Sequence, residues 1–297
     1  MANILIAGGT GLVGQYLSKK LISQGHSVRI LTRNPINKND FYWNVLSNQI
    51  DNKAFLNLEY IIHLAGAGIA DKRWSSQRKK EIIDSRTKST TLLFNKTKEL
   101  KTPLKGFIAA SAVGYYGAIT SKIIFKETDK PATDFLGNVC KEWEKASLTF
   151  NDLNIPTTIL RTGIVLSKNG GALSKMNTPI AITPIASGKQ YIPWIHIEDL
   201  SNLFIKAIED SEFIGVYNAV APESQTSYSF AKTLAKRTKK VFIPVGVPTF
   251  VLRILFGEMS VILTTGSQIS SKKTEKTGFI FSFKKLTKAL EDSFQKP

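Results

Sequence analysis

Residues 3–14 read NILIAGGTGLVG, an apolar run that leads into glycines at positions 8, 11 and 14. The run predicts a buried parallel strand over Asn3–Gly9. A helix should follow and end near Gly25, because apolar residues recur at helical spacing at Leu12, Val13, Tyr16, Leu17 and Leu21. Val28–Thr32 then predicts a second strand. A strand–helix–strand unit of this kind is typical of the first half of a Rossmann fold.

The glycines of this turn each have a mechanical role in dinucleotide binding. One makes the tight turn, one lets the backbone approach a pyrophosphate, and one permits close packing of helix on strand. The helix N-terminus also presents free N–H groups and a positive dipole end. The alternative, a tight turn without a ligand, is disfavoured by the strand–helix context. The predicted cofactor contacts here are Gly8, Thr10, Gly11, Leu12, Val13 and Gly14.

The end of the second predicted strand indicates which dinucleotide binds. NAD-binding proteins usually place a carboxylate there for the ribose 2′-hydroxyl. This chain has Thr32-Arg33-Asn34, and no carboxylate follows until Asp40. A guanidinium suits a 2′-phosphate through bidentate, charge-assisted hydrogen bonds. We therefore expect NADP(H), with an ordinary exposed loop arginine as the alternative for Arg33.

Strands and helices continue to alternate beyond this unit. We expect strands at 60–65, 107–110 and 157–166, and helices at 77–100 and 136–150. This order predicts an α/β fold with a doubly wound parallel sheet. Residues 1–166 should form the dinucleotide-binding domain, with its sheet completed by later segments up to about residue 220, including a strand at 216–220. Residues 167–297 should form a smaller substrate-side and C-terminal region, with helices at 199–209, 228–236 and 248–256.

Composition excludes several classes of protein. The single cysteine, Cys140, leaves no internal disulfide, and the three histidines show no metal-ligand spacing, so we expect no metal site. We expect neither a membrane span nor a targeting segment, and hence a cytoplasmic protein. The net charge is +17, and residues 230–297 hold 13 Lys or Arg against 4 Asp or Glu. We interpret this excess as a solvated surface and expect no nucleic-acid partner, because no recognition module accompanies it.

Several segments together resemble a known family over essentially the whole chain. They are residues 8–28 (GGTGLVGQYLSKKLISQGHSV), LTRNP, HLAGAGIADKRW, KKEIIDSRTKSTTLL, SAVGYYG, LRTGIVLSKNGGAL, PWIHIEDL and, near the end, VPTFVLRILFGEMS with TGF. The chain is similar to the extended short-chain dehydrogenases/reductases. Within them it resembles the atypical subgroup called epimerase family proteins, of unknown function. The segment 246–293 is similar to the small C-terminal domain of unknown function that accompanies this subgroup.

The resemblance implies further cofactor contacts. Thr32 and Arg33 would meet the adenosine phosphate, and the strand end before Gly66 would line the ribose and pyrophosphate. The implied residues beyond the glycine turn and the second strand are Leu64, Ala65, Gly66, Glu81, Arg86 and Val165. Glu81 and Arg86 lie roughly 140° apart around a helix, so they cannot both point into one site, and Glu81 is the weaker candidate. Alternatively, Glu81 and Arg86 are charged residues of the helix surface that do not contact the cofactor.

The catalytic pattern of the superfamily, Tyr-x-x-x-Lys with an upstream Ser or Thr, is absent. Aligning Leu136 with the tyrosine puts Cys140 at the lysine, and Ser111 lies one place away from the expected hydroxyl position. The remaining candidates are Ser111, Tyr115, Tyr116 and Cys140. Instead of acting in catalysis, the two tyrosines could pack under the cofactor, and Cys140 could be an inert buried thiol. For His196 a pocket wall and a packing residue at a helix entry both remain open.

Three functions are compatible with this pattern. The first is an NADP(H)-dependent oxidoreductase or epimerase-like enzyme of atypical mechanism, acting on a small carbonyl compound or nucleotide sugar by analogy with the family. The second is a non-catalytic NADP(H)-binding structural or sensing protein with a protein partner, since some relatives carry a cell-division label. The third, binding of nucleic acid by the lysine-rich C-terminal region, is the least favoured. The resemblance implies neither a particular substrate nor an oligomeric state.

Overall fold

An eight-stranded sheet forms the centre of the molecule, in the order β12-β8-β6-β5-β1-β2-β3-β4. The computed structural model describes residues 1–295, so the last two residues of the region predicted at 167–297 lie outside it. The strands are β1 (Asn3–Ala7), β2 (Ser27–Thr32), β3 (Asp40–Asn44), β4 (Gln49–Ile50), β5 (Tyr60–His63), β6 (Gly106–Ala112), β8 (Thr157–Thr162) and β12 (Gly215–Ala219). All neighbours pair in parallel except β3 and β4. The predicted doubly wound fold is confirmed.

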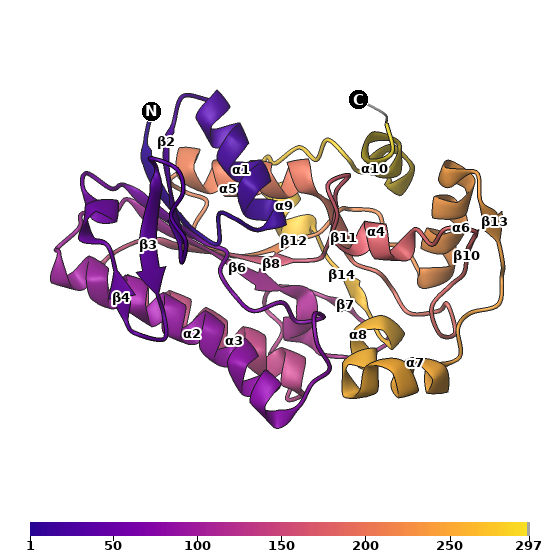
Figure 1. Ribbon diagram of the computed structural model, residues 1–297. Coiled ribbons are helices and arrows are strands. Elements are labelled where there is room, and N and C mark those ends of the chain that lie inside the picture. The colour runs from indigo at the N-terminus through magenta and orange to yellow at the C-terminus, as the bar shows by residue number, and fades with distance from the viewer. Residues whose placement is uncertain (296–297) are drawn as a thin grey trace.

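Helices cover both faces of this sheet (Figure 1). On one face lie α1 (Leu12–Ser23) and α5 (Ile197–Glu209), and on the other lie α2 (Ser76–Glu99) and α3 (Phe135–Leu148). Each face has its own apolar core, because strands buried on both sides present alternate side chains to opposite layers. Leu17 and Phe204 belong to the first core, and Leu93 and Phe107 to the second.

The order of strands creates a switch point between β1 and β5. The chain leaves β1 for β2 on one side and later returns to β5 on the other side. Ligands of open α/β sheets bind in the crevice outside the carboxyl ends of the strands at such a point. The fold therefore places the glycine-rich turn after β1 and the residues after β5 at the same crevice.

The expected single strand over 157–166 was wrong. The chain forms β8 in the main sheet and then β9 (Ile164–Leu166), which pairs with β11 (Trp194–His196) in a separate two-stranded sheet. Gly163 lies at the break, where a Cβ atom would come within 2.7 Å of the carbonyl oxygen of Pro193. The close approach of that backbone, which a run of apolar residues does not reveal, explains the break.

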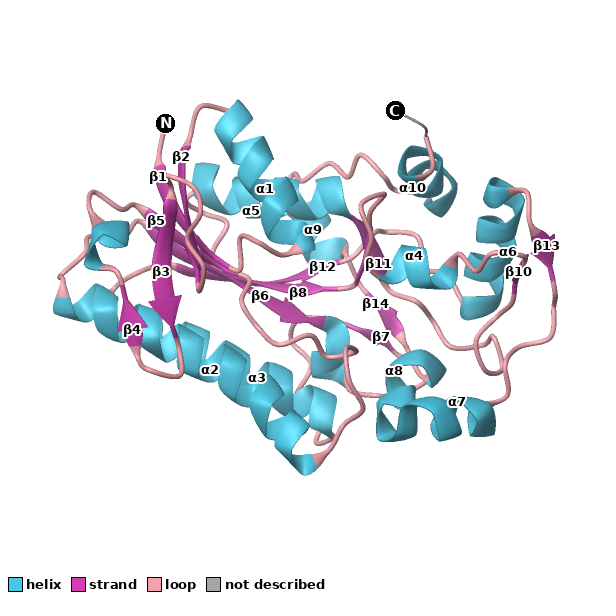
Figure 2. Cartoon of the chain, viewed as in Figure 1, coloured by secondary structure: helices cyan, strands magenta, loops and turns pink. Residues whose placement is uncertain are grey.

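Most of the remaining elements extend the molecule beyond the carboxyl ends of the strands, whereas α9 lies beside β12 (Figure 2). The remaining elements are β7 (Ile124–Phe125), α4 (Ala172–Met176), β10 (Ala181–Ile182), α6 (Ser227–Thr238), β13 (Val241–Phe242), α7 (Thr249–Phe256), α8 (Val261–Thr264), β14 (Gln268–Ile269), α9 (Lys272–Lys276) and α10 (Leu286–Ser293). Short 3₁₀ turns occur at Asn52–Phe55, Val113–Tyr116, Thr149–Leu153 and Gly257–Ser260. A third apolar core joins α6 and α10 through Phe230, Leu234 and Leu290.

Among residues 1–295, none of the helices is both long enough and apolar enough to cross a bilayer.

Candidate cofactor and active site

The glycine-rich turn has the geometry that a dinucleotide requires. Gly8 has a φ of +90°, and a Cβ atom there would come within 2.8 Å of the backbone of Leu64 and Ala65. At Gly14 a Cβ atom would come within 2.6 Å of the Cα of Gly9, so only glycine allows α1 to pack this close to the turn. Helix α1 begins with Gly11 as its N-cap, and no side chain caps its first N–H groups. These groups remain available to a phosphate.

The residues predicted around this turn lie together. The contact of Gly8 with Leu64 and Ala65 joins the ends of β1 and β5. Val13, Leu64 and Val165 are half-buried and pack against the same apolar core. A Cβ atom on Gly171 would lie 2.9 Å from the Leu12 side chain, so the loop after β9 covers the start of α1. Thr10 is exposed at the turn itself.

Arg86 lies beneath the loop that follows β5, whereas Glu81 does not. The Arg86 guanidinium would lie 3.0 Å from a Cβ atom on Gly66, and its Nη1 donates to the carbonyl oxygens of Ala67 and Ile82. Burial lowers the pKa of Arg86. The half-exposed Glu81 carboxylate instead forms an ion pair of 2.8 Å with Arg78. The two side chains therefore diverge around α2.

Arg33 is exposed directly after β2 and forms no ion pair with the described residues 1–295. Thr32 is half-buried, and its hydroxyl accepts a hydrogen bond from the Asn34 N–H. Asp40 is the first carboxylate after the strand. Its Oδ2 accepts from the N–H groups of Ile36 and Asn37 and from the Asn37 side chain, so it closes its own loop.

Ser111 and Cys140 lie against a buried ion pair at the floor of the crevice. The Arg161 guanidinium and the Glu144 carboxylate form two hydrogen bonds of 2.9 Å, and each side chain is less than a tenth exposed. Ser111 donates to Glu144 at 2.7 Å. Burial and the neighbouring Glu144 raise the pKa of Cys140 to about 12, so the thiol stays protonated and unreactive near neutral pH.

The two adjacent tyrosines have different surroundings. The buried Tyr116 hydroxyl donates to Asn218 Oδ1 at 2.7 Å and accepts from Arg161 at 3.0 Å, and burial raises its pKa to about 12. Tyr115 is half-buried, and its ring lies against the Arg161 guanidinium, 3.3 Å from Cζ to the ring centroid. Burial raises the pKa of Tyr115 despite the charge of Arg161. Of the four catalytic candidates, Tyr115 alone combines an ionisable group with partial exposure.

His63, at the end of β5, is fully buried in a polar relay. Trp143 donates from Nε1 to His63 Nδ1 at 3.2 Å, so Nε2 carries the proton and donates to Ser89 at 2.8 Å. Burial and the positive charge of Arg86 lower the pKa of His63 to about 3. The imidazole therefore stays neutral and orders the layer beneath the crevice.

His196 acts as a helix-entry residue. It is the N-cap of α5, where its Nδ1 accepts from the Glu198 N–H, and its ring packs on Phe283. In the part of the chain that the structure describes, no group of three or more His, Cys, Asp or Glu side chains could hold a metal ion.

The sequence analysis identified three residues of the floor neither as catalytic nor as binding candidates: Arg161, Glu144 and Asn218. Leu136, Cys140 and Glu144 are spaced by four along α3 and therefore share a face, and that spacing pointed to the carboxylate. Arg161 is a charged residue within an otherwise uncharged, buried strand, and such a residue requires a buried partner. Asn218 lies on β12, and no local pattern in the sequence predicts its contact with Tyr116.

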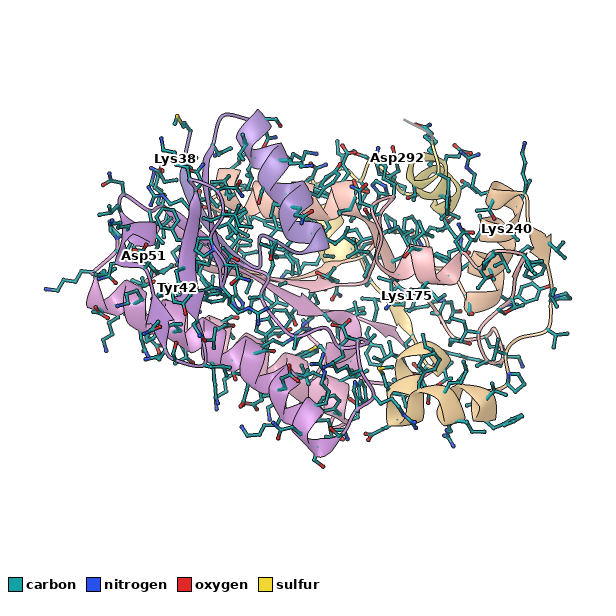
Figure 3. The ribbon with its side chains drawn as sticks, in the orientation of Figure 1. Lys38, Tyr42, Asp51, Lys175, Lys240 and Asp292 are labelled. Carbon is teal, nitrogen blue, oxygen red and sulfur yellow. The ribbon has the colours of Figure 1, made fainter. Side chains whose placement is uncertain are left out.

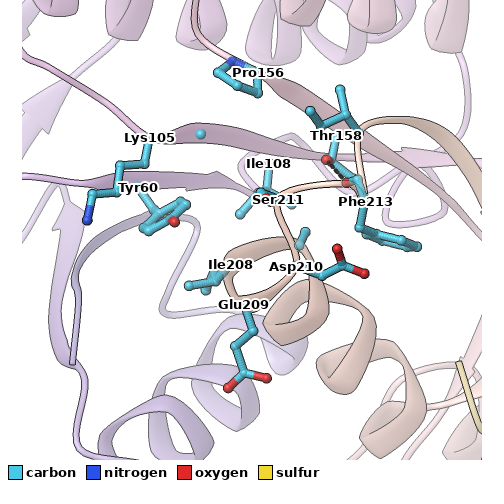
Figure 4. A pocket seen from close by; sticks show the side chains of 13 residues that line it. Tyr60, Lys105, Ile108, Pro156, Thr158, Ile208, Glu209, Asp210, Ser211 and Phe213 are labelled. Atoms are coloured by element: carbon cyan, nitrogen blue, oxygen red, sulfur yellow. Dashed lines mark hydrogen bonds between the residues drawn. The ribbon is translucent and has the colours of Figure 1, made fainter. Parts of the chain in front are cut away.

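A separate cavity of about 390 Å³ opens at the amino ends of the strands, opposite the crevice (Figure 4). Its lining includes Tyr60, Gly106 and Thr158, which lie at the amino ends of β5, β6 and β8. The crevice residues follow the carboxyl ends of the strands, so the length of the strands separates the crevice from this cavity. This cavity is therefore distinct from the predicted cofactor site.

Comparison with known proteins agrees with this geometry. The NAD dependent epimerase/dehydratase family matches residues 4–220. The chain belongs to this family. A domain of unknown function, DUF1731, matches residues 247–293. Epimerase family protein SDR39U1 of Mus musculus is 33% identical over 97% of this chain and 98% of its own length. An epimerase family protein of Mycobacterium leprae is 31% identical over 100% and 97%.

Solved structures of the family show the same fold. Human epimerase family protein SDR39U1, crystallised with NADPH, superimposes with a TM-score of 0.85 at 30% identity, covering 98% of each chain. UDP-glucuronic acid 4-epimerase of Bacillus cereus, solved with UDP-glucuronic acid and NAD, gives 0.77 at 18% identity, covering 97% of this chain and 96% of its own, which shows the fold alone. This chain therefore has the NAD(P)-binding fold of the epimerase family.

Proposed function

We propose that the chain binds NADPH in the crevice between β1 and β5, with Arg33 at the 2′-phosphate. The exposed Arg33 side chain, which forms no ion pair within residues 1–295, carries this proposal, because a ribose 2′-phosphate needs such a cation at the end of β2. The hydrogen bonds of Asp40 to its own loop support it, since they withhold the carboxylate that NAD would require. The human relative crystallised with NADPH supports the same choice.

The test is a fluorescence titration with NADPH and NADH. We expect preferential binding of NADPH, and we expect Arg33→Ala to weaken it by about tenfold or more, since a charge-assisted contact is lost. NADH affinity should change little. Lys38→Ala, which removes another exposed cation of the same loop, is the matched control. Equal affinity for both cofactors in the unaltered protein would refute the assignment of Arg33.

For the chemistry, we propose reduction of a small carbonyl compound by hydride from NADPH, with the Tyr115 phenol as proton donor. Tyr115 is half-buried beside the floor, and the shift of its pKa above the usual value keeps the proton on the phenol. A neutral phenol can donate to a developing alkoxide. The same shift disfavours a phenolate base, which oxidation of an alcohol would need at the start of epimerisation. Reduction is therefore the better-supported direction.

This chemistry is tested by NADPH oxidation with a panel of aldehydes and ketones. Tyr115→Phe should lower kcat/KM by on the order of 100-fold, the usual contribution of a general acid. NADPH affinity should be unchanged. Tyr116→Phe is the matched control: its hydroxyl is buried between Asn218 and Arg161, so its loss should reduce stability more than turnover. Full activity of Tyr115→Phe would rule out its role as proton donor.

The second candidate is a non-catalytic NADPH-binding protein with a protein partner. The buried floor favours it, because Ser111, Tyr116 and Cys140 are engaged in a protein network or held protonated by burial. This function would be supported over reduction if the protein binds NADPH but turns over no carbonyl compound. The Tyr115→Phe variant should then bind NADPH as tightly as the unaltered protein and likewise show no turnover.

A further inference from the structure

Two segments on the side of the molecule beyond the crevice contain no carboxylate. Residues 167–195 and 224–257 include neither Asp nor Glu. They contain nine cationic residues: Lys168, Lys175, Lys189, Lys232, Lys236, Arg237, Lys239, Lys240 and Arg253. These segments form α4, β10, α6, β13 and α7. Figure 3 shows Lys175 and Lys240 at this end of the molecule, opposite β3 and β4.

The nine cations are not neutralised within the protein. Among residues 1–295, none of them forms an ion pair with a carboxylate. Lys240 donates to the Asn177 side chain and to the Thr178 carbonyl oxygen. Two carboxylates on neighbouring elements, Glu258 and Asp292, face Lys79 and His196 instead. This end of the molecule therefore attracts anions.

The same segments expose large apolar side chains in unusual density. We call this set the apolar edge: Ile180, Val241, Ile243, Val245, Phe250, Ile254 and Leu255. Ile180 is 82% exposed and Ile254 is 70% exposed, although both are aliphatic. Isolated exposed apolar residues are normal, but a group within one short segment marks an interaction surface.

The apolar edge is continuous along the chain and the fold. Ile180 precedes β10, which pairs in parallel with the strand that contains Val241. Residues 243–248 then lead from β13 into α7, and Ile185 forms a bridge with Val247 along the way. Helix α7 follows with Phe250 and Ile254, which are spaced by four and share one helix face. Figure 1 shows β10, β13 and α7 together at this end.

We propose that the apolar edge and its cations dock on the surface of a bilayer with anionic headgroups. Lipid fits both features, because aliphatic side chains enter the boundary between headgroups and acyl chains while lysines contact the anionic surface. Nucleic acid would use the cations but not the aliphatic residues, since it is recognised through phosphate contacts and stacking. Helix α7, at eight residues, lies on the surface and does not cross the bilayer.

The experiment is co-sedimentation of the full chain with vesicles, without added cofactor. Vesicles of phosphatidylglycerol and phosphatidylcholine in equal parts are compared with vesicles of pure phosphatidylcholine. We expect binding to the anionic vesicles, weakened but not abolished by raised salt, because apolar insertion is not screened. Absence of binding to anionic vesicles would overturn the proposal.

Two variants separate the apolar and the charged contributions. Phe250→Gln with Ile254→Gln should lower the partition coefficient by on the order of tenfold or more, because buried CH₂ groups are lost. Lys175→Gln, Lys232→Gln and Lys236→Gln together should lower it by about fivefold per charge. The control for the apolar variant is Leu46→Gln with Leu56→Gln, which changes two exposed aliphatic residues outside the two segments. The control for the lysine variant is Lys19→Gln with Lys98→Gln and Lys122→Gln, which changes three exposed lysines outside them.

Each outcome decides between occupants of this surface. Binding that is reduced equally by the lysine variant and its control, and not by the apolar variant, would be general electrostatic adsorption and would refute the proposal. Loss of self-association in the apolar variant, measured by sedimentation velocity without lipid, would assign the surface to a second copy of the chain instead. NADPH titration of each variant confirms folding and keeps this result independent of the proposed function.

Discussion

The glycine-rich turn and the floor beneath it have opposite characters. The turn leaves the first N–H groups of α1 uncapped and Arg33 exposed, so it is open to a ligand. In the floor, Ser111, Glu144 and Arg161 are bonded to one another and buried. One region is shaped for something that binds, and the other is already complete as protein structure.

The proposed cofactor site and the residues of the floor therefore belong to separate structural units of this fold. Phosphate recognition depends on backbone geometry after β1, whereas Tyr-x-x-x-Lys chemistry depends on one face of α3. Here that face carries Leu136, Cys140 and Glu144, and the last of these is held in a buried ion pair with Arg161.

Removing the carboxylate of the floor should have the largest effect. Glu144→Ala leaves the Arg161 charge buried without a partner, which should lower the free energy of unfolding by about 3–5 kcal/mol. Urea denaturation measures this loss. Ser111→Ala, which removes one hydrogen bond to the same carboxylate, should cost only about 1 kcal/mol. Equal, small effects of both substitutions would show that the floor is not the structural unit described here.

The Gly14→Ala variant tests whether the glycine-rich turn binds the phosphates of the cofactor. A Cβ atom would come within 2.6 Å of the Cα of Gly9, so α1 must shift and its N–H groups must move. We expect NADPH affinity to fall by on the order of 100-fold, since several charge-assisted bonds depend on this geometry. The variant should keep the circular dichroism spectrum of the unaltered protein, so that a loss of affinity reports on the turn and not on folding. Unchanged affinity in Gly14→Ala would contradict the turn as phosphate site.

The smallest effect at neutral pH should come from His63, whose protonation changes stability only as the solution becomes acidic. Its pKa falls to about 3 in the folded protein, so the unfolded chain takes up a proton below about pH 6.5 that the folded chain does not. Stability from this group is present above pH 6.5 and is lost by about 1.4 kcal/mol per pH unit as pH falls towards 3. Thermal denaturation of His63→Gln should show a shallower decline over this window. Parallel curves would exclude His63 as the titrating group.

The sequence predicted the amino-terminal part of the fold closely, because its signals are local. The glycines at 8, 11 and 14, the helical repeat after Leu12 and the apolar strands each follow from backbone geometry or burial. The strand break at Gly163 depends on the distant Pro193 backbone, and β3 depends on pairing with β2, so neither has a local signature.

The same distinction between local signals and contacts of distant residues applies to the candidate site. Gly8, Leu64 and Ala65 were predicted together and lie together, since strand ends of a parallel sheet meet at one edge. Asn218 could not be predicted, because its partner Tyr116 is 102 residues away in the chain. The directions of the Arg86 and Glu81 side chains also depend on their partners, backbone carbonyl oxygens for Arg86 and the Arg78 guanidinium for Glu81.

The contacts of β12 have a consequence for how the molecule unfolds. Asn218 donates from its side chain to the Ser270 carbonyl oxygen and accepts on its own carbonyl from Thr274, while Asp199 of α5 accepts from the N–H groups of Ser282 and Phe283. The segment matched by the domain of unknown function thus satisfies buried polar groups of the sheet and of a covering helix. Although two family models match separate parts of the sequence, we therefore expect the sheet and this segment to unfold together in a single transition.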